Sequence, residues 1–233
     1  MPEGNPRACD PDRPPPPGRI VAAFDFDGTI TTLDTLLDFL SFAIGRGRFA
    51  ASAVRSAPWL IGALTRMCDR GSAKARLLAT SIGGMTRQEL EATAQMYVDQ
   101  RLPALVRPEM SARVREHGQL GHQLVLVSAS PTLYLKLWAA QAGFDAVLAT
   151  ELAFHGDVFW GRLAGPNCWG PEKVRRLQQW LGSDRPSVLY AYGDSRGDRE
   201  MLAFADHAWL RGKGELPPIA TANPSCPRRF RDP

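Results

Sequence analysis

The sequence predicts an α/β fold, a Rossmann-like three-layer α/β/α arrangement around a parallel sheet. From residue 105 to residue 211, apolar runs of strand length alternate with segments of helical periodicity, the pattern of parallel strands joined by helical crossovers. Several runs end in Asp, Ser or Gly. Because the carboxyl ends of parallel strands share one edge of the sheet, we expect the functional site at that edge.

The first predicted strand is the apolar run 21–24, which ends at Asp25 and Asp27 and is closed by the turn Gly28-Thr29. An apolar run of this length before a glycine is typical of a buried parallel strand. Two carboxylates this close together are unfavourable unless a cation or a division of roles compensates. We interpret Asp25 and Asp27 as candidate functional residues, with a simple capped turn as the alternative.

The next segment, residues 35–104, is predicted to be helical and to form an insertion between the first two strands. Apolar residues at helical spacing follow Leu33, and Thr86 with Glu89 forms a capping box that opens a helix to about Arg101. We expect this inserted segment to form a subdomain of its own rather than a single crossover helix.

Within the insertion, residues 49–67 are rich in Ala, Leu, Ile and Trp, but Arg55, Pro58 and Arg66 interrupt them. No continuous apolar run long enough to span a membrane therefore exists there. A packed helix pair is the first interpretation. A membrane-facing patch around Trp59, giving peripheral membrane contact through the insertion, is the second.

The rest of the chain alternates between the two element types. We expect helix at 108–117, strand at 122–128, helix from Ser130-Pro131 with Ser130 as N-cap, strand at 146–152, a hairpin around 154–158, helix at 170–181, strand at 187–192, helix at 199–204 and a short strand at 208–210. The α/β core is thus predicted to be 19–34 plus 105–211, with a disordered Pro-rich lead-in at 1–18 and a flexible tail at 212–233.

Composition indicates a globular protein that favours anionic partners. The 233 residues are 44% hydrophobic with a net charge of +4, and no basic stripe interleaved with aromatic residues indicates nucleic-acid binding. No secretory signal is visible, so we expect a cytoplasmic protein. The cysteines lack disulfide or zinc spacing and are typical of reduced thiols; they are Cys9, Cys68, Cys168 and Cys226.

Polar groups lie at the ends of three predicted strands and at the start of one predicted helix, and they are expected to converge at the sheet edge. They are Asp25 and Asp27, Ser128, Lys173, and Asp194 with Asp198. Oxygen ligands without His or Cys favour Mg²⁺, which also pairs with substrate phosphate. Lys173 and Ser128 could hold the remaining phosphate oxygens.

These motifs, in this order, resemble the haloacid dehalogenase superfamily of phosphohydrolases. The first is Asp25-Phe26-Asp27-Gly28-Thr29, the second Ser128, the third Lys173 and the fourth Gly193-Asp194-Ser195-Arg196-Gly197-Asp198. The helical insertion after the first motif is similar to the C1 cap of the phosphoserine-phosphatase-like branch, subfamily IB. The resemblance implies an HAD-like core with an all-helical C1 cap at 35–104.

The resemblance also implies a phosphomonoester hydrolase that works through an aspartyl-phosphate. Asp25 would be the nucleophile and Asp27 the general acid and base. Mg²⁺ would bind Asp25, the Asp27 carbonyl and Asp194. Substrate phosphate would meet Ser128, Ala129 and Lys173, with Asp198, Gly28 and Thr29 in support.

The substrate stays open between a small and a lipid-linked phosphomonoester. Phosphoserine phosphatase and phosphatidylglycerophosphate-type lipid phosphatase are the alternatives within the resemblance. Asp34 falls where phosphoserine phosphatases tend to have a Glu that binds the substrate amine. Lys74 and Arg76 could grip a second anionic group on the substrate, although a solvated helix face is the simpler interpretation of both.

Two further readings belong to other classes of function. The aspartyl-phosphate would equally serve a phosphotransferase or mutase, and a non-catalytic phosphate-binding or membrane-docking module is the alternative to an enzyme. The four histidines have no metal spacing, so we expect surface or edge positions for His117, His122, His155 and His207. For Cys168 we expect a packing role.

Overall fold

A computed structural model describes residues 19–65, 69–183 and 185–219. The predicted lead-in at 1–18 lies outside these residues, as do the predicted tail from residue 220 onward and three of the cysteines, Cys9, Cys68 and Cys226. Among the residues described, no helix is both long and apolar enough to cross a membrane.

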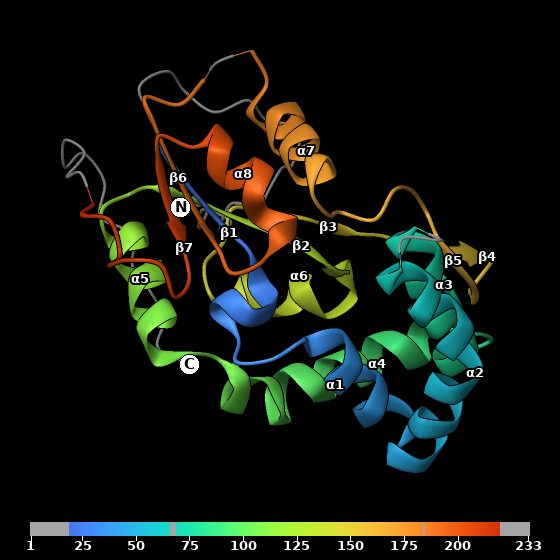
Figure 1. Ribbon diagram of the computed structural model, residues 1–233. Coiled ribbons are helices and arrows are strands. Elements are labelled where there is room, and N and C mark those ends of the chain that lie inside the picture. Colours follow the sequence, from blue (N-terminus) through green and yellow to red (C-terminus); the bar gives the residue numbers. More distant parts are fainter. Residues whose placement is uncertain (1–18, 66–68, 184, 220–233) are drawn as a thin grey trace, which may run out of the picture.

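A parallel sheet of five strands forms the centre of the molecule, in the order β3-β2-β1-β6-β7 (Figure 1). Its strands are β1 (Ile20–Phe24), β2 (Gln123–Pro131), β3 (Ala146–Thr150), β6 (Val188–Gly193) and β7 (His207–Leu210). The β1 strand lies between β2 and β6 and is buried at every position. The central place of β1 explains why its sequence is a continuous apolar run.

Helices cover both faces of this sheet. They are α5 (Pro108–Gln119) and α6 (Thr132–Gln141), and α7 (Pro171–Leu181) and α8 (Arg199–Phe204). Alternate residues of β1 point to opposite faces, so Ala22 and Phe24 join the cluster with α5 and α6, while Val21 and Ala23 join the cluster with α7 and α8. This three-layer arrangement confirms the predicted α/β class.

The segment between β1 and α5 is helical, as predicted. It contains α1 (Thr35–Ile44), α2 (Arg46–Leu64), α3 (Arg70–Ile82), α4 (Arg87–Gln100) and the short 3₁₀ turn η2 (Leu102–Leu105). The capping box of Thr86 and Glu89 starts α4. We call residues 35–104 the cap segment, a boundary that stays a prediction.

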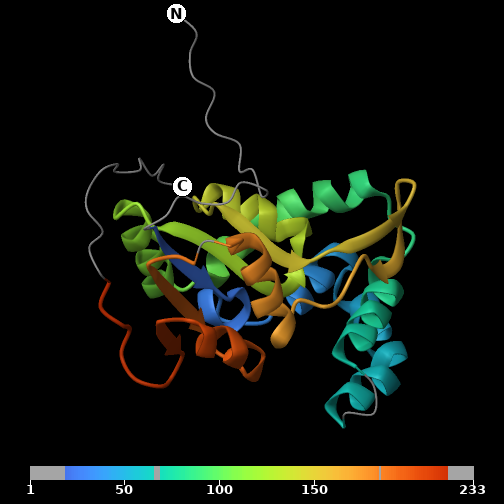
Figure 2. The ribbon, with the colours of Figure 1, turned by 90° about the horizontal axis from the view of Figure 1, so that it is seen from above.

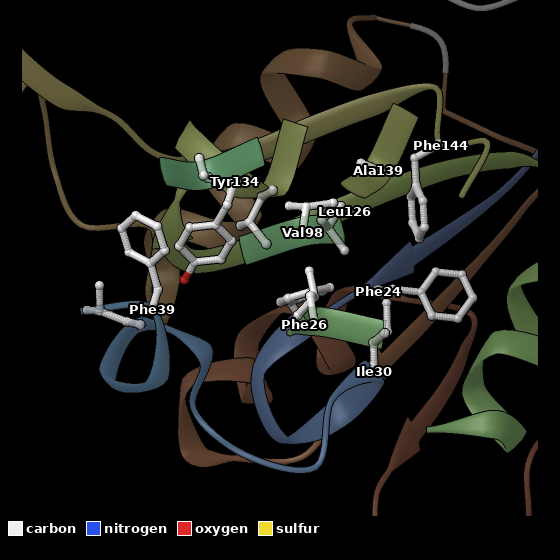
Figure 3. Packing of buried hydrophobic residues seen from close by; sticks show 14 of the residues in the cluster. Phe24, Phe26, Ile30, Phe39, Val98, Leu126, Tyr134, Ala139 and Phe144 are labelled. Atoms are coloured by element: carbon white, nitrogen blue, oxygen red, sulfur yellow. The ribbon is translucent and has the colours of Figure 1, made fainter. Parts of the chain in front are cut away.

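The cap segment shares one apolar core with the sheet rather than enclosing a separate one. Phe39 of α1 and Val98 of α4 belong to the same buried cluster as Phe24, Leu126 and Tyr134 (Figure 3). The ring centroids of Phe39 and Tyr134 are 5.0 Å apart. Helices α1 and α4 of the cap segment are therefore packed firmly against the core beside one side of the sheet edge.

A β-hairpin fastens the opposite side of the cap segment. Its antiparallel strands are β4 (Leu152–His155) and β5 (Val158–Leu163), as the hairpin prediction expected. The Phe159 amide donates to the Met85 carbonyl at 2.9 Å, and the Gly84 amide donates to the Phe159 carbonyl at 3.1 Å. These bonds attach the hairpin to the α3–α4 connection.

Two predicted boundaries were wrong. The second strand continues through Ser130 to Pro131, so α6 begins at Thr132 and Ser130 does not cap it. The Ser130 hydroxyl makes a bond elsewhere, described below, which explains why it is not used as a cap. The predicted strand at 146–152 is divided, because Glu151 separates β3 from β4.

The surface or edge positions expected for His117 and His122 were also wrong, since both side chains are buried. Their Nδ1 atoms lie 2.8 Å apart, and His117 Nε2 lies 2.7 Å from the Tyr192 hydroxyl. A polar chain of this kind is compatible with burial because each ring finds a hydrogen-bond partner. His155 and His207 are exposed, as expected.

Candidate active site

Asp25 stands directly after the central strand and is held from three directions. Its backbone amide donates to the Tyr192 carbonyl of β6 at 2.9 Å. The Thr29 hydroxyl donates to Asp25 Oδ2 at 3.0 Å, and Lys173 Nζ donates to Asp25 Oδ1 at 2.5 Å. Burial raises the pKa of Asp25 to about 7, although Lys173 opposes the rise.

Asp27 faces away from Asp25 and is surrounded by donors. Oδ1 accepts from the Thr35 amide at 2.7 Å and the Thr35 hydroxyl at 2.5 Å, and Oδ2 accepts from Ser130 Oγ at 2.6 Å and Ser128 Oγ at 3.4 Å. The two aspartates thus occupy separate polar environments although one residue divides them in the sequence.

Gly28 allows this reversal of direction. Its φ of 77° lies in the left-handed region, and a Cβ on this residue would overlap the Asp194 carboxylate. Any larger residue would therefore be strained and would also push Asp194 away. The turn at Gly28 thus allows the first motif to contact Asp194 of the fourth motif.

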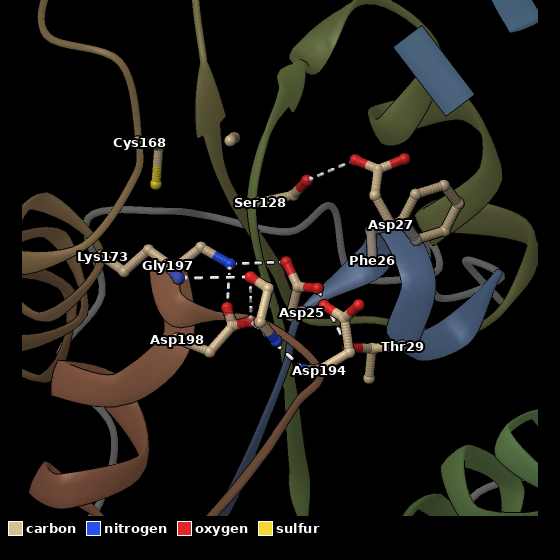
Figure 4. A network of polar contacts seen from close by, with 12 residues as sticks. Asp25, Phe26, Asp27, Thr29, Ser128, Cys168, Lys173, Asp194, Gly197 and Asp198 are labelled. Atoms are coloured by element: carbon tan, nitrogen blue, oxygen red, sulfur yellow. Dashed lines mark hydrogen bonds and ion pairs between the residues drawn. The ribbon is translucent and has the colours of Figure 1, made fainter. Parts of the chain in front are cut away.

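Lys173 projects from the first turn of α7 into the gap between two carboxylates (Figure 4). Its ammonium bonds Asp25 Oδ1 and, at 2.6 Å, Asp198 Oδ1, and its side chain is 2% exposed. Burial by itself lowers the pKa of Lys173, but Asp25 and Asp198 outweigh burial and raise it. The lysine therefore stays protonated and offsets one of the buried negative charges.

Asp198 is fully engaged by its neighbours. Oδ2 accepts from the Asp194 and Ser195 amides at 3.2 and 2.9 Å and from the Ser195 hydroxyl at 3.0 Å. With Oδ1 on Lys173, both oxygens have partners. This geometry suits a residue that orients Lys173 and the backbone at Asp194.

Three carboxylates are close enough to share a cation. Oxygen atoms of Asp25, Asp194 and Asp198 all lie within 4.8 Å of one another. Burial and the Asp198 charge raise the pKa of Asp194, although Arg211 and Lys173 oppose the rise. Hard oxygen donors with excess negative charge fit a divalent cation such as Mg²⁺. The Asp27 side chain is not in this group.

Ser128 and Ser130 lie on the same side of β2, two residues apart, and both reach Asp27. The Ser130 amide donates to Ser128 Oγ at 3.0 Å. The carbonyl of Ala129 accepts a bond from Lys74 Nζ at 2.6 Å. The sequence motif thus converges with the aspartates, although Ser130 was expected to play a different part.

Lys74 of α3 reaches the sheet edge, so the solvated helix face expected for it was wrong. Besides the Ala129 carbonyl, its ammonium donates to Asn167 Oδ1 at 2.9 Å. Burial lowers the pKa of Lys74 to about 8, with Asp27 and Asp34 opposing the change. Arg76 is exposed and lies over the Trp59 ring, 4.5 Å from its centroid.

Asp34 serves as the N-cap of α1. Its Oδ1 accepts from the amides of Leu36 and Leu37 at 2.9 and 3.3 Å. Burial and the charge of Asp27 raise the pKa of Asp34. This carboxylate therefore stabilises the first turn of α1, where the cap segment begins.

One residue of the site, Thr35, was not identified from the sequence. Thr35 supplies two of the four donors on Asp27, and its hydroxyl also lies 3.1 Å from the Tyr134 hydroxyl. The spacing of Ser128 and Ser130 was a usable signal, since residues two apart in a strand share a face. No comparable pattern marks Thr35. Cys168 is buried, and burial raises its pKa to about 11, in keeping with the predicted packing role.

Comparison with known proteins gives matches to both the sequence and the fold. The family model of haloacid dehalogenase-like hydrolases matches residues 22–203. The protein CicA of Caulobacter vibrioides is 36% identical over 193 residues, covering 82% of this chain and 86% of CicA. A similar fold occurs in a Bordetella pertussis Tohama I protein of unknown function, with 24% identity, a TM-score of 0.70 and coverage of 82% and 88%. A substrate-bound phosphoserine phosphatase has a TM-score of 0.60 at 15% identity, with coverage of 82% and 84%.

Proposed function

The chain belongs to the haloacid dehalogenase-like hydrolase family, and from that premise we propose that it is a Mg²⁺-dependent phosphomonoester hydrolase with Asp25 as nucleophile. The observation that supports this most is the clamped Asp25 carboxylate, held between Lys173 Nζ and Thr29 Oγ1 at the end of the central strand. A fixed carboxylate beside a protonated lysine suits attack on a negatively charged phosphoryl group.

In the first step an Asp25 oxygen attacks phosphorus while the bond from phosphorus to the ester oxygen breaks. A proton from Asp27 goes to the departing alkoxide, which leaves as the alcohol. In the second step Asp27 takes a proton from water, the water oxygen attacks phosphorus, and the bond to Asp25 breaks. Inorganic phosphate and the original carboxylate result.

The donors around Asp27 suit both halves of this cycle. As a carboxylate, Asp27 accepts bonds from Thr35 and Ser130. When Asp27 carries the proton, the Ser130 hydroxyl can rotate and accept instead, since a hydroxyl is both donor and acceptor. Ser130 is thus proposed as a positioning residue for Asp27.

The rest of the polar cluster would bind and neutralise phosphate. Lys173 meets the developing negative charge, and Asp198 keeps its ammonium in place. Ser128 and the Ala129 backbone lie at the neighbouring strand end and would hold further phosphate oxygens. Asp25, Asp194 and the Asp27 carbonyl would hold Mg²⁺, which supplies charge neutralisation at the phosphoryl group.

For the substrate we propose a small phosphomonoester with a second anionic group. Lys74 supports this, because its ammonium reaches from the cap segment to the Ala129 carbonyl, next to the proposed phosphate site. One ammonium in a largely buried position favours a ligand carboxylate or phosphate over a neutral group. The capping role of Asp34 gives no comparable support for recognition of a substrate amine.

Release of phosphate from an aryl phosphate in the presence of Mg²⁺ tests the proposed reaction. Asp25→Asn is expected to lower kcat by at least roughly 1,000-fold while leaving the circular dichroism spectrum unchanged. Asp157→Asn is the matched control, because the Asp157 side chain is exposed and far along the chain in the hairpin turn. Normal turnover by Asp25→Asn would exclude the proposed nucleophile.

A metabolite panel then addresses the substrate and the alternative reactions. The panel contains phosphoserine, sugar phosphates, polyol phosphates and phosphatidylglycerophosphate, each with and without Mg²⁺. Transfer of phosphate to an added alcohol in preference to water would replace the hydrolase with a phosphotransferase. Phosphate binding without turnover of any phosphomonoester would replace it with a binding module.

A further inference from the structure

The α2 helix of the cap segment turns two buried serines toward α3 and leaves large aliphatic side chains exposed, which is unusual for a surface helix. Ser52 and Ser56 are buried against α3. Ser52 Oγ donates to the Thr80 carbonyl at 2.8 Å, and Ser56 Oγ lies 2.9 Å from Thr80 Oγ1. Hydroxyl groups thus help to join α2 to α3. Phe49 of α2 packs against the main core, whereas Val54 and Ile61 are left exposed.

The outward face is a continuous apolar stripe. Ala50, Val54, Ala57 and Ile61 follow one another at intervals of four, three and four residues, which places them on one side of a helix. Val54 is 73% exposed and Ile61 is 59% exposed. Exposed aliphatic side chains aligned in this way indicate a surface that associates with something.

Positive charge accompanies the stripe. Arg46, Arg48 and Arg55 are exposed, and the helix Arg46–Leu64 contains no Asp or Glu. In the part of the chain that the structure describes, none of these three arginines forms an ion pair within 4.0 Å. The surface is therefore apolar and cationic together.

A small pocket opens beside the stripe, between α2, the end of α3 and the end of α1. Its volume is about 140 Å³, and its polar lining consists of Arg48, Arg55, Ser52, Thr80 and Ser81. Ser81 Oγ is buried and has no hydrogen-bond partner among the described residues. Two guanidinium groups beside the one unused hydroxyl, that of Ser81, suit a phosphate-type anion.

We propose that this face, residues 46–61 of α2 with the adjoining pocket, docks on an anionic phospholipid surface. Val54 and Ile61 would enter the interfacial region, and the pocket would receive a headgroup phosphate. Figures 1 and 2 both place α2 and α3 side by side at the end of the molecule away from β7. That position lets the face meet a flat surface.

The charge argues against a second copy of the chain as the occupant. A symmetric dimer through this face would bring two patches of the same positive charge into one interface. Like charges in contact are unfavourable, whereas anionic headgroups supply the opposite charge. The inference is independent of the proposed hydrolysis.

Sedimentation with vesicles tests the proposal. We expect the wild-type protein to bind vesicles that contain phosphatidylglycerol and phosphatidylcholine, and not vesicles of phosphatidylcholine alone. Val54→Ser with Ile61→Ser is expected to weaken binding about tenfold, and Arg48→Gln with Arg55→Gln by a similar factor. Both pairs should hydrolyse an aryl phosphate at the wild-type rate.

Matched controls come from exposed residues elsewhere. Met96→Ser removes an apolar side chain that is 47% exposed on α4, and Arg115→Gln with Arg199→Gln removes two exposed charges; neither should alter vesicle binding. Absence of binding to anionic vesicles, or equal loss in the controls, overturns the proposal. A wild-type dimer that Val54→Ser with Ile61→Ser dissociates would assign the face to self-association. Complete competition by soluble glycerol phosphate would assign the pocket to free phosphate.

Discussion

At the scale of single residues, the site separates two aspartates that are nearly adjacent in sequence. Asp25 shares its oxygens with Lys173 and Thr29, whereas Asp27 is enclosed by hydroxyl and amide donors from Thr35 and β2. The Asp25 environment fixes a carboxylate beside a positive charge, which suits its proposed role as nucleophile. The hydroxyl partners of Asp27 can each donate or accept a hydrogen bond, which suits the proposed role of Asp27 as acid and base.

Lys74 provides a prediction at the same scale. Because its pKa is lowered to about 8, its charge is lost as pH rises through 8. For a substrate with a second anionic group, kcat/KM should therefore fall above pH 8. At pH 7, Lys74→Met should raise KM for that substrate roughly 10- to 100-fold, the contribution of a hydrogen bond between charged groups, with kcat little changed.

The conservative variant separates charge from packing. Lys74→Arg should retain the low KM at pH 7 and abolish the decline above pH 8, since arginine stays protonated. A phosphomonoester without a second anionic group serves as the control substrate. Equal effects of Lys74→Met on both substrates would show that Lys74 supports the site only structurally.

The motif residues were predictable because each follows a strand or begins a helix. Asp25 and Asp194 directly follow β1 and β6, Ser128 lies in the last part of β2, and parallel topology brings these carboxyl ends together. The role of Thr35 was not predictable, because its contact with Asp27 depends on the direction in which α1 starts after the Gly28 turn. His117 was misplaced for a related reason: its burial depends on partners 5 and 75 residues away along the chain.

At the scale of elements, the β4–β5 hairpin is one of the contacts that hold the cap segment in place. Gly161 of β5 approaches α3 closely, because a Cβ on it would lie 2.7 Å from Ala79 Cβ. Its φ of 73° also lies in the left-handed region. Close approach and backbone conformation together require glycine here.

Gly161→Ala is therefore expected to lower the free energy of unfolding by about 2–4 kcal/mol, from backbone strain and overpacking combined. Gly156→Ala is the matched control, since Gly156 also has positive φ, 56°, but nothing lies within 4 Å of its Cβ position. It should cost only about 1–2 kcal/mol. Urea unfolding measures both, and equal losses would show that contact with α3 contributes nothing.

A second element-scale prediction concerns the histidine chain that links α5, β2 and β6. Burial lowers the pKa of His117 from 6.5 to about 3. Between pH 6.5 and 3, His117 binds a proton in the unfolded chain but not in the folded protein. The free energy of unfolding therefore falls as pH decreases toward 3. The contribution is at most about 1.4 kcal/mol per pH unit.

His117→Gln removes this titration and should flatten the profile between pH 6.5 and 5 relative to wild type, although its stability at pH 7 is lower. His155→Gln, at an exposed position, should keep the wild-type slope. Urea unfolding at several pH values gives the comparison. Parallel wild-type and His117→Gln profiles would mean that His117 is protonated in the folded protein.

At the scale of the whole molecule, the site brings Asp25, from the start of the α/β core, next to Asp194 and Asp198, from its end. These three carboxylates carry excess negative charge. Mg²⁺ should therefore raise the melting temperature by roughly 5–10 °C when present at about 100 times its dissociation constant. Asp194→Asn should abolish this dependence because it removes one of the three clustered carboxylates. Calorimetry without substrate measures the shift, and an undiminished shift in Asp194→Asn would exclude Asp194 as a ligand.

The alternation of strands and helices in the core was predictable because parallel strands buried on both faces are continuous apolar runs. The hairpin was predictable from its turn residues. The packing of the cap segment against the core was not predictable. It depends on long-range contacts such as Phe39 with Tyr134 and Phe159 with Met85. Local periodicity contains no information about such pairs.

The order of the sheet also governs when the protein can become active. Val188 in β6 pairs with Ile20 in β1, although 168 residues (188 − 20) separate them. At typical synthesis rates the ribosome needs on the order of 10–30 s to cover that interval. Until then the strand that bears Asp25 has one side open, and Lys173 and Asp194 are not yet in place. A nascent chain therefore lacks the assembled cluster around Asp25 until β6 has been synthesised.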